Sequence, residues 1–84
     1  MKTVRIYTTP FCPYCVRAKS LLTKKAAAFE EIDVMMDQGA REEMQERSGG
    51  ARTVPQIFIG DSHIGGSDDL YALEKAGELD ALLA

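Results

Sequence analysis

Apolar and polar residues alternate over residues 4–8 (V-R-I-Y-T), and the β-favouring residue types there predict a strand. The spacing then becomes helical from Pro13 to about Ala27, with apolar positions at Cys15, Ala18, Leu21 and Leu22. Pro13 suits the first turn of a helix, because the N–H that proline lacks would have no partner there. Residues 29–34 predict a second strand, so the first half of the chain has the pattern of a βαβ unit.

The second half of the chain predicts two further strands between helices. The elements expected there are a polar helix over 37–48, a strand over 56–59, a hairpin turn into a short strand at 63–64, a helix from Ser67 or Asp68 that Gly77 interrupts, and a last turn or two over 78–83. The strand at 56–59 is apolar at three successive positions, which indicates burial on both faces. The order β-α-β-α-β-β-α predicts one α/β domain over residues 1–84, with a four-stranded mixed sheet and helices on both sides.

The two cysteines of the chain stand two residues apart, in Cys12-Pro13-Tyr14-Cys15, where the β pattern gives way to the helical one. A Cys-x-x-Cys pair at that place in a βαβ unit indicates a thiol–disulfide redox site. One thiol must attack a disulfide as a thiolate, and the other must be close enough to resolve the mixed disulfide. Partial positive charge and free N–H groups at the helix start favour the thiolate of Cys12, so we expect Cys12 to be the nucleophile. Cys15, one turn further in, is the expected resolving thiol.

Other uses of the pair are weaker interpretations. Structural zinc would need four ligands, and His63 is the only other soft candidate, so we expect no metal site. A disulfide that only stabilised the fold would close too few residues to constrain the unfolded chain much.

Composition and charge narrow the class of partner. The chain has 84 residues, a net charge of −3 and a pI near 5.0, which argue for one modest core and against binding to nucleic acid or to an anionic membrane. The first ten residues resemble neither a signal peptide nor a membrane span. We therefore expect a cytoplasmic protein, in a reducing compartment where such a cysteine pair is reactive.

Three motifs then stand in one order: C-P-Y-C at 12–15, T-V-P at 53–55 and G-G-S-D-D-L at 65–70. Together they closely resemble a dithiol glutaredoxin of the thioredoxin fold, over essentially the whole chain. The small bacterial glutaredoxins are the nearest likeness, through R-E-E-M at 41–44 and T-V-P-Q-I-F-I at 53–59. Thioredoxin is a poorer match, because its usual W-C-G-P-C contains a tryptophan and this chain has none.

The resemblance implies a glutathione-dependent oxidoreductase with no tightly bound cofactor. Glutathione would be its co-substrate, and its partners would be protein disulfides and glutathionylated proteins, with ribonucleotide reductase as one candidate. We expect it to act as a monomer.

The same resemblance implies roles for residues of the first two motifs. Pro55 corresponds to the cis-proline that faces the cysteines in this fold, and Val54 before it would offer its N–H and C=O to an extended peptide such as glutathione. Thr53 would contact the ligand through its side chain. Tyr14 would flank the bound glutathione, with a spacer that faces solvent as the alternative.

The third motif and one arginine complete the implied binding site. Gly66 and Ser67 would hold the γ-glutamyl carboxylate at the start of a helix, and Asp68 would pair with the ammonium group or serve as a helix cap. Arg41 stands roughly where glutaredoxins offer a side chain to the glycine carboxylate, and an ordinary surface charge is the alternative. Thr9 departs from the family, because many members have a lysine there. We therefore expect weaker glutathione binding, or a Cys12 thiolate that relies more on the helix end and the nearby N–H groups.

Two other functions stay open at this point. The chain could resemble a glutaredoxin but take electrons from thioredoxin reductase. It could also carry an iron–sulfur cluster held between two subunits by Cys12 and glutathione thiolates, although Pro13 and Tyr14 disfavour that function.

Overall fold

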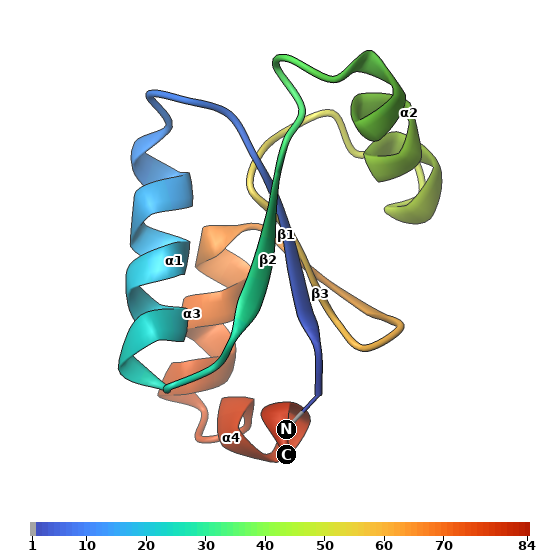
Figure 1. The fold of residues 1–84 in the computed structure, drawn as a ribbon. Coiled ribbons are helices and arrows are strands. Elements are labelled where there is room, and N and C mark those ends of the chain that lie inside the picture. Colours follow the sequence, from blue (N-terminus) through green and yellow to red (C-terminus); the bar gives the residue numbers. More distant parts are fainter. Residues whose placement is uncertain (1) are drawn as a thin grey trace.

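A four-stranded mixed sheet organises the computed structural model, which describes residues 2–84 (Figure 1). The elements in chain order are β1 (Val4–Thr8), α1 (Pro13–Lys24), β2 (Phe29–Asp33), α2 (Gln38–Arg47), β3 (Gln56–Ile59), β4 (Ser62–Gly65), α3 (Ser67–Lys75) and α4 (Leu79–Leu83). This is the predicted order, and the mixed sheet with flanking helices is the thioredoxin fold expected from the motifs. Within residues 2–84, every helix is too short or too polar to cross a bilayer.

The strand order β2-β1-β3-β4 brings the segments that follow β1, β2 and β4 and the segment that precedes β3 to the same end of the sheet. β1 and β2 are parallel, with Thr8 opposite Asp33, so the loops that follow them leave at the same end. β3 is antiparallel to β1, with Gln56 opposite Tyr7, and therefore begins at that end. β4 is antiparallel to β3 and finishes there at Gly65, just before α3 starts. This end is the upper one in Figure 1.

The core lies on both faces of the sheet. One cluster joins β1 and β3 to α1, α3 and α4, and includes Leu22, Ile57 and Leu70. On the other face, Tyr7 and Phe58 meet edge to face with centroids 5.7 Å apart, under the short apolar stripe of α2. The strand β3 is buried at every position, so the predicted burial on both faces is confirmed.

The predicted end of the first helix is wrong by about three residues. α1 stops at Lys24, because Ala26 takes the left-handed conformation (φ 55°) and the Ala27 N–H turns back to donate to the Leu22 carbonyl at 3.0 Å. The turn directs the chain into β2. The other predicted boundaries lie within two residues of those observed.

Candidate active site

The cysteine pair lies at the start of α1, as predicted. Cys12 is the N-cap residue, and its Sγ accepts a hydrogen bond from the Cys15 N–H at 3.2 Å. Pro13 is the first helical residue, a position whose N–H has no partner inside the helix, so proline loses no hydrogen bond there. Cys12 is partly exposed, whereas Cys15 is only 1% exposed. The sulfur of Cys12 is therefore open to a reactant and faces the positive end of the helix.

The buried thiol of Cys15 is held in its neutral form. Burial is the largest cause and a hydrogen bond with the Cys12 side chain is the second, and they raise the pKa of Cys15 to about 12. The two thiols therefore differ in access to solvent and in surroundings. This difference suits an outer thiol that attacks first and an inner one that reacts second.

The T-V-P segment faces the pair from the start of β3. The Val54–Pro55 bond is cis, as the motif predicts, and the Val54 carbonyl oxygen lies 3.9 Å from Cys12 Sγ. A Cβ added at Gly66 would lie 3.6 Å from the Pro55 carbonyl oxygen, so this segment also approaches the start of α3 closely.

A groove of about 350 Å³ runs between the T-V-P segment and the start of α3. We call it the main groove. The residues that line it are Tyr14, Ala51, Thr53, Val54, Pro55, Gln56, His63, Gly65, Gly66, Ser67, Asp68 and Asp69. All the predicted ligand-binding residues except Arg41 are therefore brought together. Arg41 lies on α2 and is not among the lining residues, so its contact with glutathione stays a prediction.

The start of α3 presents free backbone donors and one unusual hydroxyl. The Oγ atom of Ser67 is buried and has no hydrogen-bond partner within residues 2–84, in a side chain at the border of the main groove. Asp69, the neighbour of the predicted Asp68, accepts from the Gly66 N–H at 2.9 Å and so caps the helix. This leaves Asp68 exposed at the groove. A ligand carboxylate at the helix start would meet the first N–H groups of α3 and the Ser67 hydroxyl.

No sequence pattern indicates one contact at the main groove, which joins Gln56 and His63. Gln56, which is buried, donates from Nε2 to the Thr53 carbonyl oxygen at 3.0 Å and to Thr53 Oγ1 at 3.2 Å. Its Oε1 lies 2.6 Å from His63 Nε2, which must donate because an amide oxygen only accepts. The His63 ring also stacks on Phe58, with centroids 4.9 Å apart. His63 and Gln56 thus fix the position of Thr53.

A second hollow, lined by Cys12 itself, shares no lining residue with the main groove. Its lining residues are Thr8, Thr9, Pro10, Phe11, Cys12, Cys15, Val16, Lys19, Glu31 and Asp33. Glu31 accepts from Lys19 Nζ and from Thr8 Oγ1, both at 2.9 Å. The bond from Lys19, with that from Thr8, lowers the pKa of Glu31. The Glu31 carboxylate is thus paired within the chain, and both cysteines line the same hollow.

The fold and the paired cysteines define a thioredoxin-fold protein with a redox-type motif at a helix start, and comparison with known proteins specifies the family. A model of the glutaredoxin family matches residues 4–64. The chain is 55% identical over 84 residues to a glutaredoxin of Pseudomonas aeruginosa, covering 100% of this chain and 99% of that protein. It is 55% identical over 83 residues to glutaredoxin 3 of Escherichia coli strain K12, covering 99% of each. The chain belongs to the glutaredoxin family, a class of oxidoreductases that use glutathione.

Solved structures agree with this assignment. The solution structure of glutaredoxin from Brucella melitensis superposes with a TM-score of 0.85 at 61% identity, covering 99% of this chain and 89% of that one. The crystal structure of a buckwheat glutaredoxin–glutathione complex gives a TM-score of 0.86 at 29% identity, covering 95% and 74% of the two chains.

Proposed function

We propose that this chain is a dithiol, glutathione-dependent oxidoreductase that reduces protein disulfides and glutathione mixed disulfides. The main support is the position of Cys12. Its Sγ accepts a hydrogen bond from the Cys15 N–H at 3.2 Å and lies 3.9 Å from the carbonyl oxygen of Val54, which lines the main groove, and the residue is partly exposed. The glutathione complex of the buckwheat relative supports the choice of ligand.

Glutathione is proposed to bind in the main groove as a short extended peptide. The backbone of Val54 would pair with it, and Thr53 and Tyr14 would lie beside it. Its γ-glutamyl carboxylate would take the free N–H groups and the Ser67 hydroxyl at the start of α3, and its ammonium group would pair with Asp68.

The reaction would follow two routes from one nucleophile. With a glutathionylated protein, the Cys12 thiolate attacks the glutathione sulfur, the protein thiol leaves, and a second glutathione then removes the first as glutathione disulfide. With a protein disulfide, Cys12 bonds to one substrate sulfur, and Cys15 displaces the substrate to form the Cys12–Cys15 disulfide. Two glutathione molecules then reduce that disulfide, and NADPH is consumed only by glutathione reductase.

The test compares wild type with Cys12→Ser and Cys15→Ser on a glutathionylated peptide, with glutathione, glutathione reductase and NADPH. Cys12→Ser should abolish turnover, whereas Cys15→Ser should largely preserve it, because glutathione can resolve the intermediate. Equal loss in both variants would contradict the assigned roles. A parallel reaction with thioredoxin reductase in place of glutathione and its reductase identifies the electron donor, and turnover only in that reaction would overturn the glutathione dependence.

A further inference from the structure

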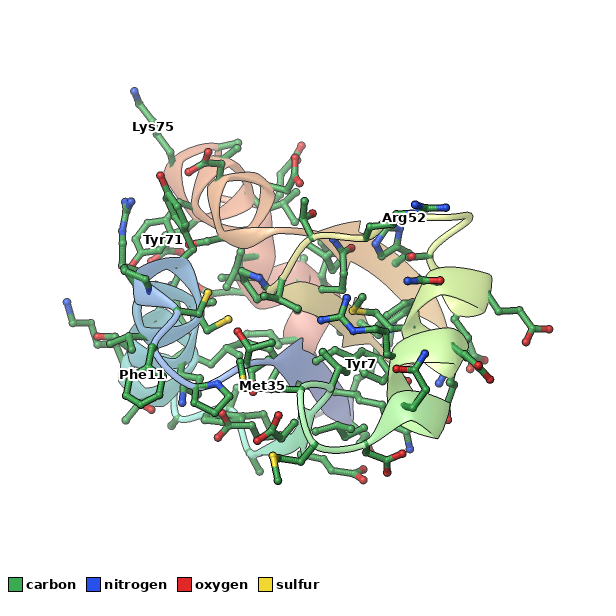
Figure 2. All side chains as sticks on the ribbon, turned by 90° about the horizontal axis from the view of Figure 1, so that it is seen from above. Tyr7, Phe11, Met35, Arg52, Tyr71 and Lys75 are labelled. Atoms are coloured by element: carbon green, nitrogen blue, oxygen red, sulfur yellow. The ribbon has the colours of Figure 1, made fainter. Side chains whose placement is uncertain are left out.

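The second hollow brings charged side chains to the same place as both cysteines. Lys19 is the basic residue among those that line it within residues 2–84, and Glu31 and Asp33 are the acidic ones. Its walls come from the start of α1 and the end of β2, next to Phe11 and Met35, which lie in the same lower half of the view in Figure 2. The glutathione proposal uses the main groove and leaves these charges without a function.

The two carboxylates of the hollow have partners inside the chain. Asp33 Oδ1 accepts a hydrogen bond from the Met35 N–H at 2.8 Å and so closes the turn after β2. Glu31 Oε2 accepts from Thr8 Oγ1 and from Lys19 Nζ, both at 2.9 Å. Thr8 is buried in β1, so its hydroxyl fixes the Glu31 carboxylate. Glu31 in turn fixes the ammonium group of Lys19 at the β2 side of the hollow.

Stability alone is a weak reason for the Lys19–Glu31 pair. The two side chains are 31% and 40% exposed, and partly exposed ion pairs contribute little to the free energy of unfolding. The position of Lys19 along α1 is more informative. Lys19 follows Cys15 by four residues, which places both on one face of the helix, whereas it lies about two turns from Cys12. The spacing therefore favours an action of Lys19 on Cys15.

Cys15 needs a positive charge nearby at the moment it reacts. It must lose its proton before it can displace a substrate from Cys12, yet burial first, and then the bond with Cys12, raise the pKa of Cys15 to about 12. A backbone hydrogen bond at Thr9 and the charge of Lys19 act in the opposite direction and lower this pKa. Thr9 has no charged side chain, so Lys19 supplies the cation of this hollow.

We propose that Lys19, held in place by Glu31, promotes the resolving step by stabilising the Cys15 thiolate as it forms. This inference rests on the proposed function, in which Cys15 displaces a protein substrate, and adds a positioning residue to that step. Lys19 acts through Cys15 rather than on the substrate. Its effect belongs to the dithiol route, because in the other route a second glutathione, and not Cys15, removes the group bound to Cys12.

The test isolates the resolving step with 2,2′-dipyridyl disulfide, a small uncharged oxidant. The Cys12 thiolate attacks one of its sulfurs; a Cys12–pyridyl disulfide forms, the S–S bond of the reagent breaks, and one thiopyridone leaves after taking a proton from water. Cys15 then gives its proton to water and attacks Cys12 Sγ; the Cys12–Cys15 disulfide forms, and a second thiopyridone leaves in the same way. The protein loses two electrons and the reagent gains two, so no glutathione is needed.

The two steps are separated in one stopped-flow record of thiopyridone absorbance. The rate of the first phase depends on the reagent concentration and reports the attack by Cys12, whereas the rate of the second phase does not and reports the displacement by Cys15. The test variant is Lys19→Met, which keeps an unbranched side chain and removes the charge. Lys19→Arg keeps a charge and tests rescue. Lys24→Met removes a positive charge at the end of α1, outside the hollow, and is the matched control.

Lys19→Met should slow the second phase about threefold at neutral pH and change the first phase little. A tenfold smaller thiolate fraction, partly offset by the greater nucleophilicity of the more basic thiolate, gives a loss of about threefold. Lys19→Arg should keep most of the wild-type rate, and Lys24→Met should keep all of it. An unchanged second phase in Lys19→Met, equal slowing of both phases, or an equal loss in Lys24→Met would overturn the proposal.

Glu31→Gln separates this role of Lys19 from a transfer of the Cys15 proton to Glu31. The glutamine amide oxygen can still accept from Lys19 and Thr8, and the negative charge that opposes a thiolate is removed. The second phase should therefore be as fast as in the wild type or faster. If it is slowed as much as in Lys19→Met, the inference is wrong, because Glu31 would then be the group that takes the proton.

The proposed function is measured separately on the wild type, as turnover of a glutathionylated peptide with glutathione and glutathione reductase. If there is no such turnover, the glutathione proposal fails, while the second phase of the dipyridyl disulfide reaction still decides the role of Lys19. If the wild type releases only one thiopyridone, Cys15 does not resolve the intermediate, and the inference fails even where glutathione turnover is observed.

Discussion

The buried hydroxyl of Ser67 gives a prediction in which stability and activity change in opposite directions. Ser67 is 3% exposed, and its Oγ has no partner within residues 2–84. A buried polar group without a hydrogen bond costs about 1–3 kcal/mol. Ser67→Ala removes the hydroxyl and leaves a better helix former at the first position of α3. We expect the variant to be more stable by about 1 kcal/mol, which raises Tm by roughly 4–8 °C in a domain of this size.

The same change should weaken glutathione binding. A hydrogen bond from a hydroxyl to a carboxylate contributes about 1.5–3 kcal/mol, so its loss should lower kcat/KM for a glutathionylated peptide by roughly tenfold or more. The activity of the wild type and the variant is compared at a temperature where both are fully folded, and Tm is measured by calorimetry on the reduced proteins. Ser67→Thr, which keeps a hydroxyl, is the control for activity.

Either half of the result can refute the reasoning. A lower Tm in Ser67→Ala would mean that the hydroxyl has a stabilising partner in the free protein. An unchanged kcat/KM would mean that Ser67 does not contact the ligand. General damage to the fold lowers stability and activity together, so it cannot produce the expected pair of opposite changes.

Three further predictions concern His63, Cys15 and Thr9. His63→Ala should raise the KM for glutathione about threefold with kcat unchanged. His63→Gln, which keeps an N–H donor for Gln56, should have a KM close to that of the wild type. Equal effects of both changes would exclude a role of His63 in positioning Gln56 and Thr53. Burial and the bond with Cys12 raise the pKa of Cys15 from 9.0 to about 12. The neutral thiol therefore contributes fully to the free energy of unfolding below pH 9, and this contribution is lost as the pH rises toward 12. In urea titrations the reduced wild type should therefore lose more free energy of unfolding between about pH 9 and 11 than Cys15→Ala does, and parallel curves would contradict this. Thr9→Lys places a cation in the hollow that contains Cys12, so alkylation of the Cys12 thiol by iodoacetamide should be faster and the KM for glutathione should be lower. The control Thr9→Gln should change neither the alkylation rate nor the KM. Equal changes in both variants would contradict the electrostatic explanation.

The ends of helices and strands could be predicted from the sequence where a local pattern, a proline or a glycine marks them. The strand at residues 4–8 has alternating β-favouring residues, and Pro55 and Gly60 border the strand at 56–59. The end of α1 carried no such signal. The run of three alanines at 26–28 favours a helix, yet Ala26 is left-handed because the chain must turn for Phe29 to pair with Val4 in the sheet. Tertiary contacts decided that boundary.

The site could be predicted as far as its motifs, but not the contacts between motifs. Gln56 and His63 are seven residues apart, and their contact depends on the pairing of β3 with β4, which shifts register between Ile57 and Phe58. No spacing rule indicates it. Likewise, adjacent aspartates cannot be told apart in sequence. Both line the main groove, and only the bond from the Gly66 N–H shows that Asp69 is the one that caps the helix.

The two surfaces beside Cys12 differ in the chemistry they offer. The main groove offers backbone donors, a hydroxyl and Asp68, which suit a small charged peptide, whereas the second hollow offers the apolar side chains of Phe11 and Val16 beside Glu31. One sulfur can form only one disulfide at a time, so a protein substrate and glutathione must react with Cys12 in succession. On the proposed function, glutathione has the main groove as its own surface, so the groove is free to bind it while a protein is attached to Cys12. The positions of the two hollows follow from the strand order: β1 leads into Phe11 and Cys12, which line the second hollow, and β3 and β4 bring the T-V-P segment and α3 to the main groove.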